Sequence, residues 1–584
     1  MENLAALLEQ KTGDLFTEVF PSANLSAFLP LEITQTTRPS FGHYQCNSAL
    51  KVAPILKENP RVVAESIVTK WRQKKDKMVD KLEVAGPGFI NIFLSADFLS
   101  QQLTKIMTDA RLGVPELKKK KRIIVEFSSP NVAKELHVGH LRSTIIGDSL
   151  ARLFEFLGHD VLRLNHIGDF GTQFGMLICY LKEKEPAVLS GGKAPSLSAL
   201  MQWYREAKKL FDADVGFKKR SQLQVIALQA KDPIAVAAWK KICEISHDGF
   251  HEIYRFLDIE LIERGESFYA ALLPKLVADF EEKQLVTVSD GAKCVFLDGF
   301  VGKEGNPLPM ILQKSDGGYN YATTDIAALL HRVKEEQAER IIYVVDAGQR
   351  THFQMVFDAA AKAGYYRPEQ VQVEHVPFGV VLGPDGKKFK TRSGETERLI
   401  DLLQCAVDRA RKILVERLED ATAQEIDELA HTLGIDAVKY ADLSCHRVKD
   451  YLFSYDKMLK FEGNTASYLL YSYVRIQGIK RRVGKKVDLL AATTPIVLVH
   501  PAELALGLHL RQFGEALGSM DRDLLPNRLS DYLYGLAEKF HLFFRDCRVE
   551  GTAQESSRLV LCELTARILE QGLAILGLKT MPRM

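Results

Sequence analysis

One short stretch restricts the fold more than any other, because an apolar run, a helical segment and a second apolar run follow one another directly. Residues 123–127 (IIVEF) form the kind of run that makes a buried parallel strand. The apolar spacing of residues 137–157 is helical and stops at Gly158, and residues 159–164 then return as a second strand. A right-handed crossover places both strands in one sheet, so this stretch predicts an open α/β sheet.

The rest of the chain extends this sheet and surrounds it. Apolar runs at 340–345 and 371–381 predict further strands, and residues 180–300 form a long, mostly helical insertion with short strands near 285–297. In the N-terminal part a turn at 86–88 precedes a strand at 89–94. From about residue 400 the chain is helical, with amphipathic segments at 398–420, 464–482, 528–546 and 556–577.

These patterns predict an α/β protein in four parts. A small α+β domain covers residues 1–115, a Rossmann-like parallel-sheet domain covers 116–400, a helical stem covers 401–460, and an all-α bundle covers 461–584. The first boundary carries a run of like charge at 118–122, which we interpret as a solvated linker in preference to a phosphate-contacting patch.

Composition excludes several classes of protein. With 77 Lys and Arg against 75 Asp and Glu, the net charge is only +2, so any nucleic acid is expected to bind through local basic patches. None of the 8 cysteines forms a C-x-x-C pair, which gives no sign of a zinc site or a disulfide framework. No apolar stretch reaches the roughly 18 residues of a membrane span, and the N-terminus lacks the pattern of a signal peptide. We therefore expect a cytoplasmic protein without a membrane segment.

The loop after the first strand carries the residues most typical of chemistry. Its sequence, SSPNVAKELHVGHLRS, is neither a P-loop nor a dinucleotide-binding G-x-G-x-x-G. His137 and His140 are three residues apart, so a helical turn places both rings on one side, and Gly139 leaves room for a flat ring. Two such imidazoles are suited to donate hydrogen bonds to a phosphoryl group. Spacing alone slightly favours the alternative, a surface histidine pair beside a capping turn.

A second basic loop, GPDGKKFKTRSGET (383–396), follows the last predicted strand. Residues 383–386 are expected to form a turn, and Lys387, Lys388, Lys390 and Arg392 crowd the rest of the loop. Glycine-bounded loops that carry cations and close over a triphosphate are typical of phosphoryl and nucleotidyl transfer. Alone it would be interpreted as a solvated basic turn, but its pairing with HVGH in one sheet favours nucleotide chemistry.

HVGH and the K-F-K-T-R loop resemble the two signatures of class I aminoacyl-tRNA synthetases. The resemblance to arginyl-tRNA synthetases of the bacterial type covers essentially the whole chain, in six ordered segments: VEFSSPNVAKELHVGHLRSTIIGD, RLNHIGDFGTQFGMLI, YATTDIA, YVVDAGQRTHF, GKKFKTRSGET and NTASYLLYSYVRI. It implies an arginine–tRNA ligase that forms arginyl-adenylate from L-arginine and ATP and then charges tRNA(Arg). The alternatives are another class I synthetase, such as the cysteinyl type, and a catalytically silent synthetase-like adaptor that binds tRNA or a partner.

The resemblance also implies the ATP site. His137, Gly139 and His140 would meet ATP, with the histidines steadying the α-phosphate and the leaving pyrophosphate. The second signature departs from the usual pattern, because its second lysine falls on Thr391. Lys134 is the candidate replacement, supported by Lys388 and Lys390. ATP is expected as a substrate accompanied by Mg²⁺, with no tightly bound cofactor and no zinc.

The implied arginine pocket is lined by five residues, Glu126, Asn131, Tyr321, Asp325 and Gln349. A guanidinium is a planar, permanently charged fork of donors, so selecting it requires carboxylates. Asp325 would grip this group beside Tyr321, while Asn131 and Gln349 would orient the amino and carboxylate ends. Judged by position alone, Asp325 is equally well explained as an acid near a helix N-terminus.

The flanking domains would hold tRNA, and the enzyme is expected to be a monomer that needs bound tRNA before it activates arginine. Phe89 and Asn91 match base-contacting positions of the family's N-terminal domain, although Phe89 is nearly as well explained as core. Tyr468 and Arg475 lie on a helix of the implied anticodon-binding bundle, where aromatic and cationic side chains suit splayed bases. Tyrosines at this spacing are more often bundle core.

Overall fold

The computed structural model describes residues 2–21, 31–36, 38–192, 195–302, 305–383, 385–387, 398–485 and 487–584. The chain divides into two compact units, of which the first comprises Met1–Leu117, Lys460–Ala574 and Lys579–Met584, and the second Lys118–Leu459 and Ile575–Leu578. The residues expected to form the stem therefore belong to the same unit as the α/β sheet. The N-terminal domain and the C-terminal bundle share the other unit.

A five-stranded sheet of order β12-β11-β5-β6-β7 is the centre of the second unit, and all its neighbouring strands are parallel. Its strands are β5 (Arg122–Glu126), β6 (Asp160–Ile167), β7 (Ile262–Gly265), β11 (Arg340–Tyr343) and β12 (Gln372–His375). Alternate residues along the strands face opposite sides, and Ile124, Leu162 and Ile341 enter one large core with helices that pack on the sheet. The predicted parallel sheet is confirmed.

The βαβ unit predicted from the sequence is also confirmed. Helix α5 (Val138–Leu157) joins β5 to β6 and ends at Gly158, whose φ of 105° lies in the left-handed region that favours glycine. Gly147 allows this helix to approach the sheet closely, because a Cβ atom there would lie 2.2 Å from Cγ of Phe127. The helix that carries the two histidines is thereby fixed against the end of β5.

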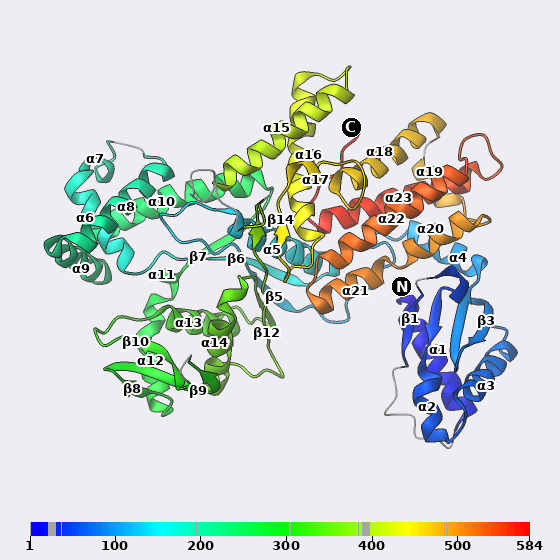
Figure 1. Cartoon of the computed structure of the whole chain (residues 1–584), viewed down its shortest axis with the longest axis horizontal. Coiled ribbons are helices and arrows are strands. Elements are labelled where there is room, and N and C mark those ends of the chain that lie inside the picture. Colours follow the sequence, from blue (N-terminus) through cyan, green and yellow to red (C-terminus); the bar gives the residue numbers. More distant parts are fainter. Residues whose placement is uncertain are drawn as a thin grey trace. The chain divides into compact units, whose positions relative to one another are not determined.

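The sequence predicted one continuous insertion at 180–300, but the structure divides it in two, because β7 lies within it and joins the main sheet as an edge strand. Its segment, IERG, is too short and polar to give a strand signal. Before β7 come five mutually packed helices (Figure 1): α6 (Thr172–Lys184), α7 (Pro186–Leu189), α8 (Leu197–Ala213), α9 (Val215–Gln229) and α10 (Pro233–Phe256).

After β7 the chain forms α11 (Glu266–Tyr269) and α12 (Leu273–Glu282) and then an antiparallel sheet of order β10-β9-β8. The strands of this sheet are β8 (Thr287–Ser289), β9 (Ala292–Val301) and β10 (Pro307–Gln313), which confirms the short strands expected near 285–297. Helices α13 (Tyr321–Lys334) and α14 (Arg350–Lys362) then flank β11 along the chain and pack against each other.

The strand predicted at 371–381 is wrong in its middle. Residues 372–375 form β12, and only Val381–Leu382 forms a further strand, β13, which pairs in parallel with β14 (Tyr451–Leu452). Pro377 lies between the two strands and has no N–H group to continue a ladder. The stem helices are α15 (Leu399–Arg417), α16 (Ala423–Leu443) and α17 (Tyr455–Met458).

The first unit contains an α+β domain and a helical bundle. The domain has a four-stranded sheet of order β1-β2-β4-β3. Its elements are α1 (Leu4–Val19), β1 (Ile33–Gln35), β2 (Tyr44–Cys46), α2 (Ser48–Leu56), α3 (Pro60–Gln73), β3 (Val79–Ala85), β4 (Phe89–Leu94) and α4 (Ala96–Met107). Strand β4 confirms the predicted strand at 89–94.

The bundle confirms the helices predicted after residue 460. It consists of α18 (Ala466–Val483), α19 (Val487–Thr493), α20 (Pro501–Arg511), α21 (Phe513–Asp523), α22 (Asn527–Asp546) and α23 (Glu555–Ile575). The carboxylate of Glu515 ties the α+β domain to the bundle, because it accepts hydrogen bonds from the Ala5 N–H, the Gln35 amide and the Tyr44 hydroxyl.

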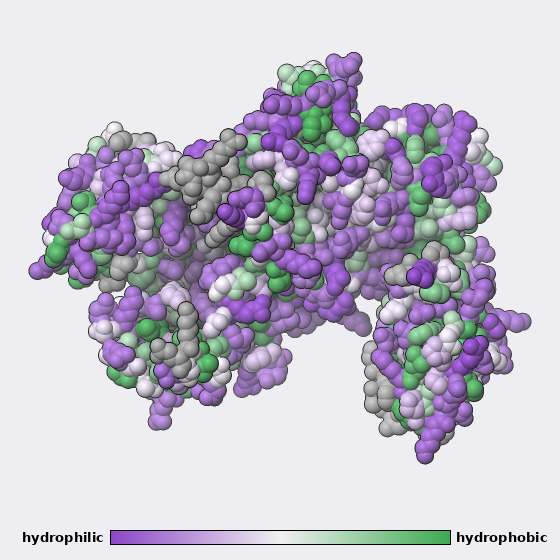
Figure 2. Space-filling view, in the orientation of Figure 1, coloured by the Kyte–Doolittle hydropathy of each residue, from purple (hydrophilic) through white to green (hydrophobic). Residues whose placement is uncertain are grey.

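Apolar side chains gather inside both units. On the face that Figure 2 shows, hydrophilic side chains dominate, and hydrophobic ones lie in small separate groups. Among the helices that the structure describes, none is long and apolar enough to cross a membrane.

Candidate active site

A cleft of about 710 Å³ opens at the carboxyl ends of β5 and β11. This is the edge at which open α/β sheets bind their ligands, and the volume lies in the range of small-molecule sites. The lining comes from the loop after β5, the first turn of α5, the segment after β11 and two further segments, 378–381 and 448–450. The sequence-predicted residues that the cleft brings together are Asn131, His137, Gly139, His140 and Gln349.

The two histidines cap helix α5 reciprocally. Nδ1 of His137 accepts a hydrogen bond from the backbone N–H of Gly139 (3.1 Å), and Nδ1 of His140 accepts one from the backbone N–H of His137 (3.1 Å). The ring centroids are 4.0 Å apart. Because each Nδ1 accepts a hydrogen bond, the neutral form of each ring would carry its proton on Nε2, where it can act as a donor. The two interpretations of the histidine pair, as caps of a helix and as donors to a phosphoryl group, are therefore compatible, because the capping bonds use only Nδ1 of each ring.

Gly139 is required by this arrangement. A Cβ atom at this position would lie 2.9 Å from Cε1 of the His137 ring. Burial, together with the charges of His137 and Lys134, lowers the pKa of His140 to about 3. His140 is therefore a neutral donor at physiological pH, and Lys134, an exposed residue three positions before His137, is near enough to affect its charge.

The loop between β5 and α5 has an unusual backbone that is fixed from several sides. Ser128, Ser129 and Ala133 all have positive φ (71°, 49° and 60°), a conformation that costs free energy in residues with a Cβ. The N–H of Ser128 donates to Oγ of Ser143 on α5, and the N–H of Ala133 donates to Oγ of Ser246 on α10. The insertion helix α10 thus supports the active-site loop directly.

Asn131 can occupy its position because the neighbouring residue, Gly168, has no side chain. It forms an isolated bridge with Gly168, where a Cβ atom would lie 2.2 Å from the Asn131 side-chain oxygen. Gln349 ends a short 3₁₀ turn after β11, and its amide donates to Asp346 at 3.2 Å. Both residues line the cleft, and the substrate-orienting roles that the resemblance implies for them stay predictions.

Asp325 lies in the second turn of α13 and is hydrogen-bonded to α14. Its Oδ2 accepts a hydrogen bond from Nε2 of His352 at 2.6 Å, and the His352 ring lies 4.8 Å from that of Tyr321. Tyr321, four residues before Asp325, is 60% exposed. His352 is on the first turn of α14, three residues after Gln349. The structure therefore places Asp325 and Tyr321 around His352, which follows the cleft-lining Gln349 closely in the chain.

Glu266 is an acid that the sequence reasoning missed. It directly follows β7, and burial together with the charges of Asp325 and Asp169 raises its pKa to about 8. Asp169 is itself buried and accepts hydrogen bonds from the N–H and hydroxyl of Ser267. Three carboxyl groups therefore lie near one another at the sheet edge. If the segment IERG (262–265) had been predicted as a strand, Glu266 would have been placed at the carboxyl end of that strand and counted among the candidate site residues.

Glu126 lies in a different environment from the one expected for an exposed ligand. It is 4% exposed and forms an ion pair with Arg332 of α13, whose side chain is fully buried. Its charge is therefore already balanced by a cation of the protein. The role in arginine binding that the resemblance implies for Glu126 stays a prediction.

Only the start of the second basic loop belongs to the described residues. The backbone N–H of Gly386 donates to the oxygen of Gly383, and the N–H of Gly383 donates to the oxygen of Lys387, which agrees with the expected turn. Lys388 and Lys390 lie outside the described residues. Within the described ranges, no group of three or more His, Cys, Asp or Glu side chains is arranged to hold a metal ion.

Phe89 and Asn91 lie on the same face of the N-terminal sheet. Alternate residues of β4, Ile90 and Ile92, are fully buried on the other face. Asn91 is only 2% exposed, and its side-chain oxygen accepts a hydrogen bond from the Gln45 amide at 2.7 Å. Phe89 is half-buried. A contact of Asn91 with a base stays a prediction, and its present partner is Gln45.

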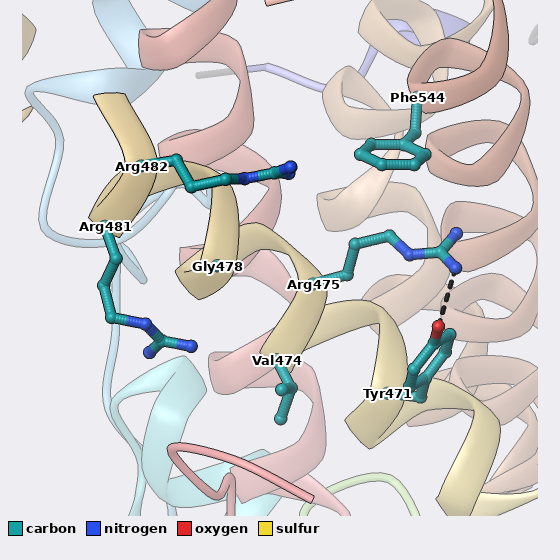
Figure 3. Close-up of a pocket in the computed structure, with 7 residues that line it drawn as sticks. All are labelled: Tyr471, Val474, Arg475, Gly478, Arg481, Arg482 and Phe544. Atoms are coloured by element: carbon teal, nitrogen blue, oxygen red, sulfur yellow. Dashed lines mark hydrogen bonds between the residues drawn. The ribbon is translucent and has the colours of Figure 1, made fainter. Parts of the chain in front are cut away.

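Arg475 lines an open groove on the bundle, with a volume of about 630 Å³ (Figure 3). Its guanidinium lies 4.7 Å from the Tyr471 ring and 4.7 Å from the Phe544 ring, and it donates a 2.8 Å hydrogen bond to the Tyr471 hydroxyl. Arg481 and Arg482 line the same groove. Tyr468 is half-buried and packs 5.7 Å from the Tyr534 ring, so it is not a fully buried core residue.

The environment of His140 yields a direct spectroscopic prediction. An ordinary histidine titrates near pH 6.5, whereas the His140 ring, with a pKa of about 3, should gain its second proton only as the pH falls far below 5. In protein with ¹³C-labelled histidine, the Cε1–H signal that disappears in His140→Gln should stay at one position between pH 5 and 8. A midpoint inside that interval would show that the ring is not held neutral.

Comparison with known proteins identifies the family. The family model of tRNA synthetases class I (R), catalytic domain, matches residues 102–455. The models of the arginyl tRNA synthetase N terminal domain and of the DALR anticodon binding domain match residues 2–94 and 469–584.

Relatives and solved structures agree with these matches. A protein of Protochlamydia amoebophila named arginine–tRNA ligase is 58% identical over 581 residues, which cover 100% of this chain and 99% of that protein. The protein of the same name from Chlamydia pneumoniae is 50% identical over 584 residues and is covered completely, as is this chain. The crystal structure of arginyl-tRNA synthetase from Plasmodium falciparum superposes with a TM-score of 0.86 at 33% identity, covering 100% of both chains. The chain therefore belongs to the arginyl-tRNA synthetase family of class I tRNA synthetases.

Proposed function

We propose that this protein attaches L-arginine to tRNA(Arg) at the expense of ATP. The arginine carboxylate attacks the α-phosphorus of ATP, which gives arginyl-adenylate and pyrophosphate. A ribose hydroxyl of the terminal tRNA adenosine then attacks the arginyl carbonyl and releases AMP. The observation that best supports this proposal is the pairing of two imidazoles at the start of α5, of which the His140 ring is held neutral, with a cluster of carboxyl groups beside the cleft.

The cleft suits ATP. The Nε2–H groups of His137 and His140 would donate to the α-phosphate and to the leaving pyrophosphate, at the N-terminal end of α5, which itself favours anions. Adenosine would lie near Gly139, against an apolar wall that includes Val345 and Phe378. Lys134, Lys388 and Lys390 would supply the positive charge that the pyrophosphate requires. Mg²⁺ would arrive with the triphosphate, and no enzyme nucleophile is needed.

The acidic side of the site suits arginine. Asp325 and Glu266 would share the guanidinium, and Tyr321 would cover its flat face. Asn131 and Gln349 would orient the α-amino and carboxylate groups toward the ATP. Glu126, paired with Arg332 below, would hold the floor of this pocket. An analogue without the guanidinium would leave buried carboxyl groups unpaired, which supports strong discrimination without an editing site.

Both parts of the first unit would bind tRNA. Phe89 would stack on an exposed base of the outer corner, with Asn91 holding Gln45 beside it. In the bundle groove, the Arg475 guanidinium between two aromatic rings would receive an anticodon base, and Tyr468 on the same helix would contribute to that surface. We further propose that the enzyme is a cytoplasmic monomer.

Amino-acid-dependent exchange of pyrophosphate into ATP tests the activity itself. With tRNA(Arg) present, arginine and none of the other nineteen amino acids should support exchange, because only its side chain satisfies the acid cluster. Without tRNA, the rate should fall to background. If another amino acid were activated instead, the assigned specificity would be wrong. Absence of any exchange would favour a tRNA-binding adaptor.

The raised pKa of Glu266 predicts that a proton is released when arginine binds. With a pKa of about 8, Glu266 is mostly protonated at pH 7, and a bound guanidinium favours its ionised form. Binding at pH 7 should therefore release close to one proton, and the affinity should rise with pH and level off above about 8. Calorimetry in two buffers of different ionisation enthalpy, with tRNA present, measures this release. Glu266→Gln serves as the control and should abolish it; an unchanged release in that variant would exclude Glu266.

Replacing Arg475 should weaken tRNA binding without affecting catalysis at saturating tRNA. Loss of a base-stacking platform costs about 1–3 kcal/mol, so Arg475→Ala should raise the Kd by about 5- to 150-fold. Arg475→Lys keeps the charge but not the planar group and should recover only part of the loss. Arg545→Ala, on the neighbouring helix and paired with Asp546, is the matched control. Equal effects of Arg475→Ala and Arg545→Ala would argue against a stacking site.

A further inference from the structure

Arg142 is a fully buried cation that the proposed mechanism does not use. It lies on α5, two residues after His140, and its side chain has no exposed surface. Its Nε is 3.1 Å from Oδ2 of Asp442, which is equally buried near the end of α16. A buried ion pair is costly to form, so its position in the fold needs an explanation.

The other end of the guanidinium holds a wall of the cleft. Nη1 of Arg142 donates hydrogen bonds to the backbone oxygens of Gly379 (2.9 Å) and Lys449 (3.1 Å). Gly379 lines the cleft, and Lys449 lies between Val448 and Asp450, which also line it. One side chain therefore joins the back of the histidine helix to the backbone of two segments on the cleft wall.

These two segments form the base of the second basic loop. The N–H of Val380 donates to Oδ1 of Asp450 at 2.7 Å, and Val381–Leu382 pairs with Tyr451–Leu452 as β13 and β14. The basic loop begins directly after Leu382. The wall also has no room to shift toward its neighbour, because a Cβ atom at Gly379 would lie 2.6 Å from Oδ1 of Asp450. The location of the Gly379 backbone thus fixes where the lysine-bearing loop starts.

We propose that Arg142 and Asp442 are positioning residues for adenylate formation, which set the distance between the two histidines and the base of the lysine-bearing loop. The inference rests on the proposed function, in which both elements act on the same triphosphate. Neither side chain touches a substrate. Misplacement of a reacting group by about 1 Å can cost roughly 100-fold in rate, so a small shift of this wall should reduce the rate of the chemical step.

The arginine and tRNA sites lie on other elements, which makes the effect selective. Among the described residues, no hydrogen bond or ion pair joins Asn131, Asp325 or Glu266 to Asp442, Gly379 or Lys449, the three residues to which Arg142 is bonded. Transfer of arginine from the adenylate to tRNA does not involve the pyrophosphate that the lysines would hold. Loss of the Arg142 contacts should therefore affect the first step and not the second.

The test compares Arg142→Lys and Asp442→Asn with the parent enzyme in two assays. Arg142→Lys keeps the charge but cannot make the forked contacts, and Asp442→Asn keeps the size of the side chain. In exchange with saturating tRNA, kcat should fall at least ten-fold while the KM for arginine stays within two-fold. Transfer to tRNA from chemically synthesised arginyl-adenylate should stay within two-fold. Rates are expressed per folded protein, measured by near-UV circular dichroism.

Three further variants separate the possible outcomes. Arg163→Lys, whose partners Asp148 and Glu155 lie farther along the same helix, should leave both steps unchanged. Equal losses in both steps, or no loss per folded protein, in Asp442→Asn would overturn the positioning role, even if Arg142→Lys fails to fold. Lys388→Ala and Lys390→Ala test the proposed loop: if both exchange normally, that part of the proposed function fails and the inference with it. If they lose exchange and the Arg142 and Asp442 variants do not, only the inference fails.

Discussion

Like charges that are close together and partly removed from water cannot all be ionised, and this constraint governs the acidic side of the site. Burial, together with the charges of Asp325 and Asp169, raises the pKa of Glu266 to about 8. The protein thus keeps a proton where a permanent cation would bind. A guanidinium would replace that proton and relieve the repulsion, whereas a neutral side chain would do neither. Selectivity for arginine would then follow because the free protein has, among its described residues, no permanent cation to pair with these carboxyl groups, and the guanidinium of the substrate supplies it.

The opposite side of the site presents donors to a phosphate, and the His140 ring, whose pKa burial lowers to about 3, does so without a charge at physiological pH. Each imidazole takes a backbone N–H of the α5 terminus at Nδ1 and offers its own Nε2–H instead. The helix end is thereby extended by a rigid ring. The strained loop from Ser128 to Ala133 allows this entry into the helix, and α10 of the insertion keeps the loop in place. The insertion therefore contributes to the geometry of the site as well as to the fold.

Sequence reasoning recovered what depends on periodicity and on local motifs. The buried run at 123–127, the helix that ends at Gly158 and the later amphipathic helices all appear where their patterns placed them. The histidine spacing correctly put both rings together. Strand β7 was missed because four polar-rich residues carry no periodic signal, and with it Glu266, whose importance depends on the end of that strand.

Other features depend on contacts between distant residues, which no local pattern contains. The ion pair of Glu126 with Arg332 joins residues about 200 positions apart. Glu126 lies at a strand end, where the sequence alone indicates a ligand-binding acid, but in the fold its carboxylate is paired with a cation of the protein. The burial of Asn91 under its bond to Gln45 follows from the order of strands in a sheet. The link from Arg142 to Gly379 and Asp442 likewise exists only once the helices are assembled.

A crystal structure of the enzyme with arginine, a non-hydrolysable ATP analogue and tRNA(Arg) bound together would show where both substrates bind. The guanidinium should lie within hydrogen-bonding distance of both Asp325 and Glu266, and the α-phosphate should be within reach of Nε2 of His140. A guanidinium bound away from Glu266, or a triphosphate that does not approach the histidine pair, would contradict this assignment.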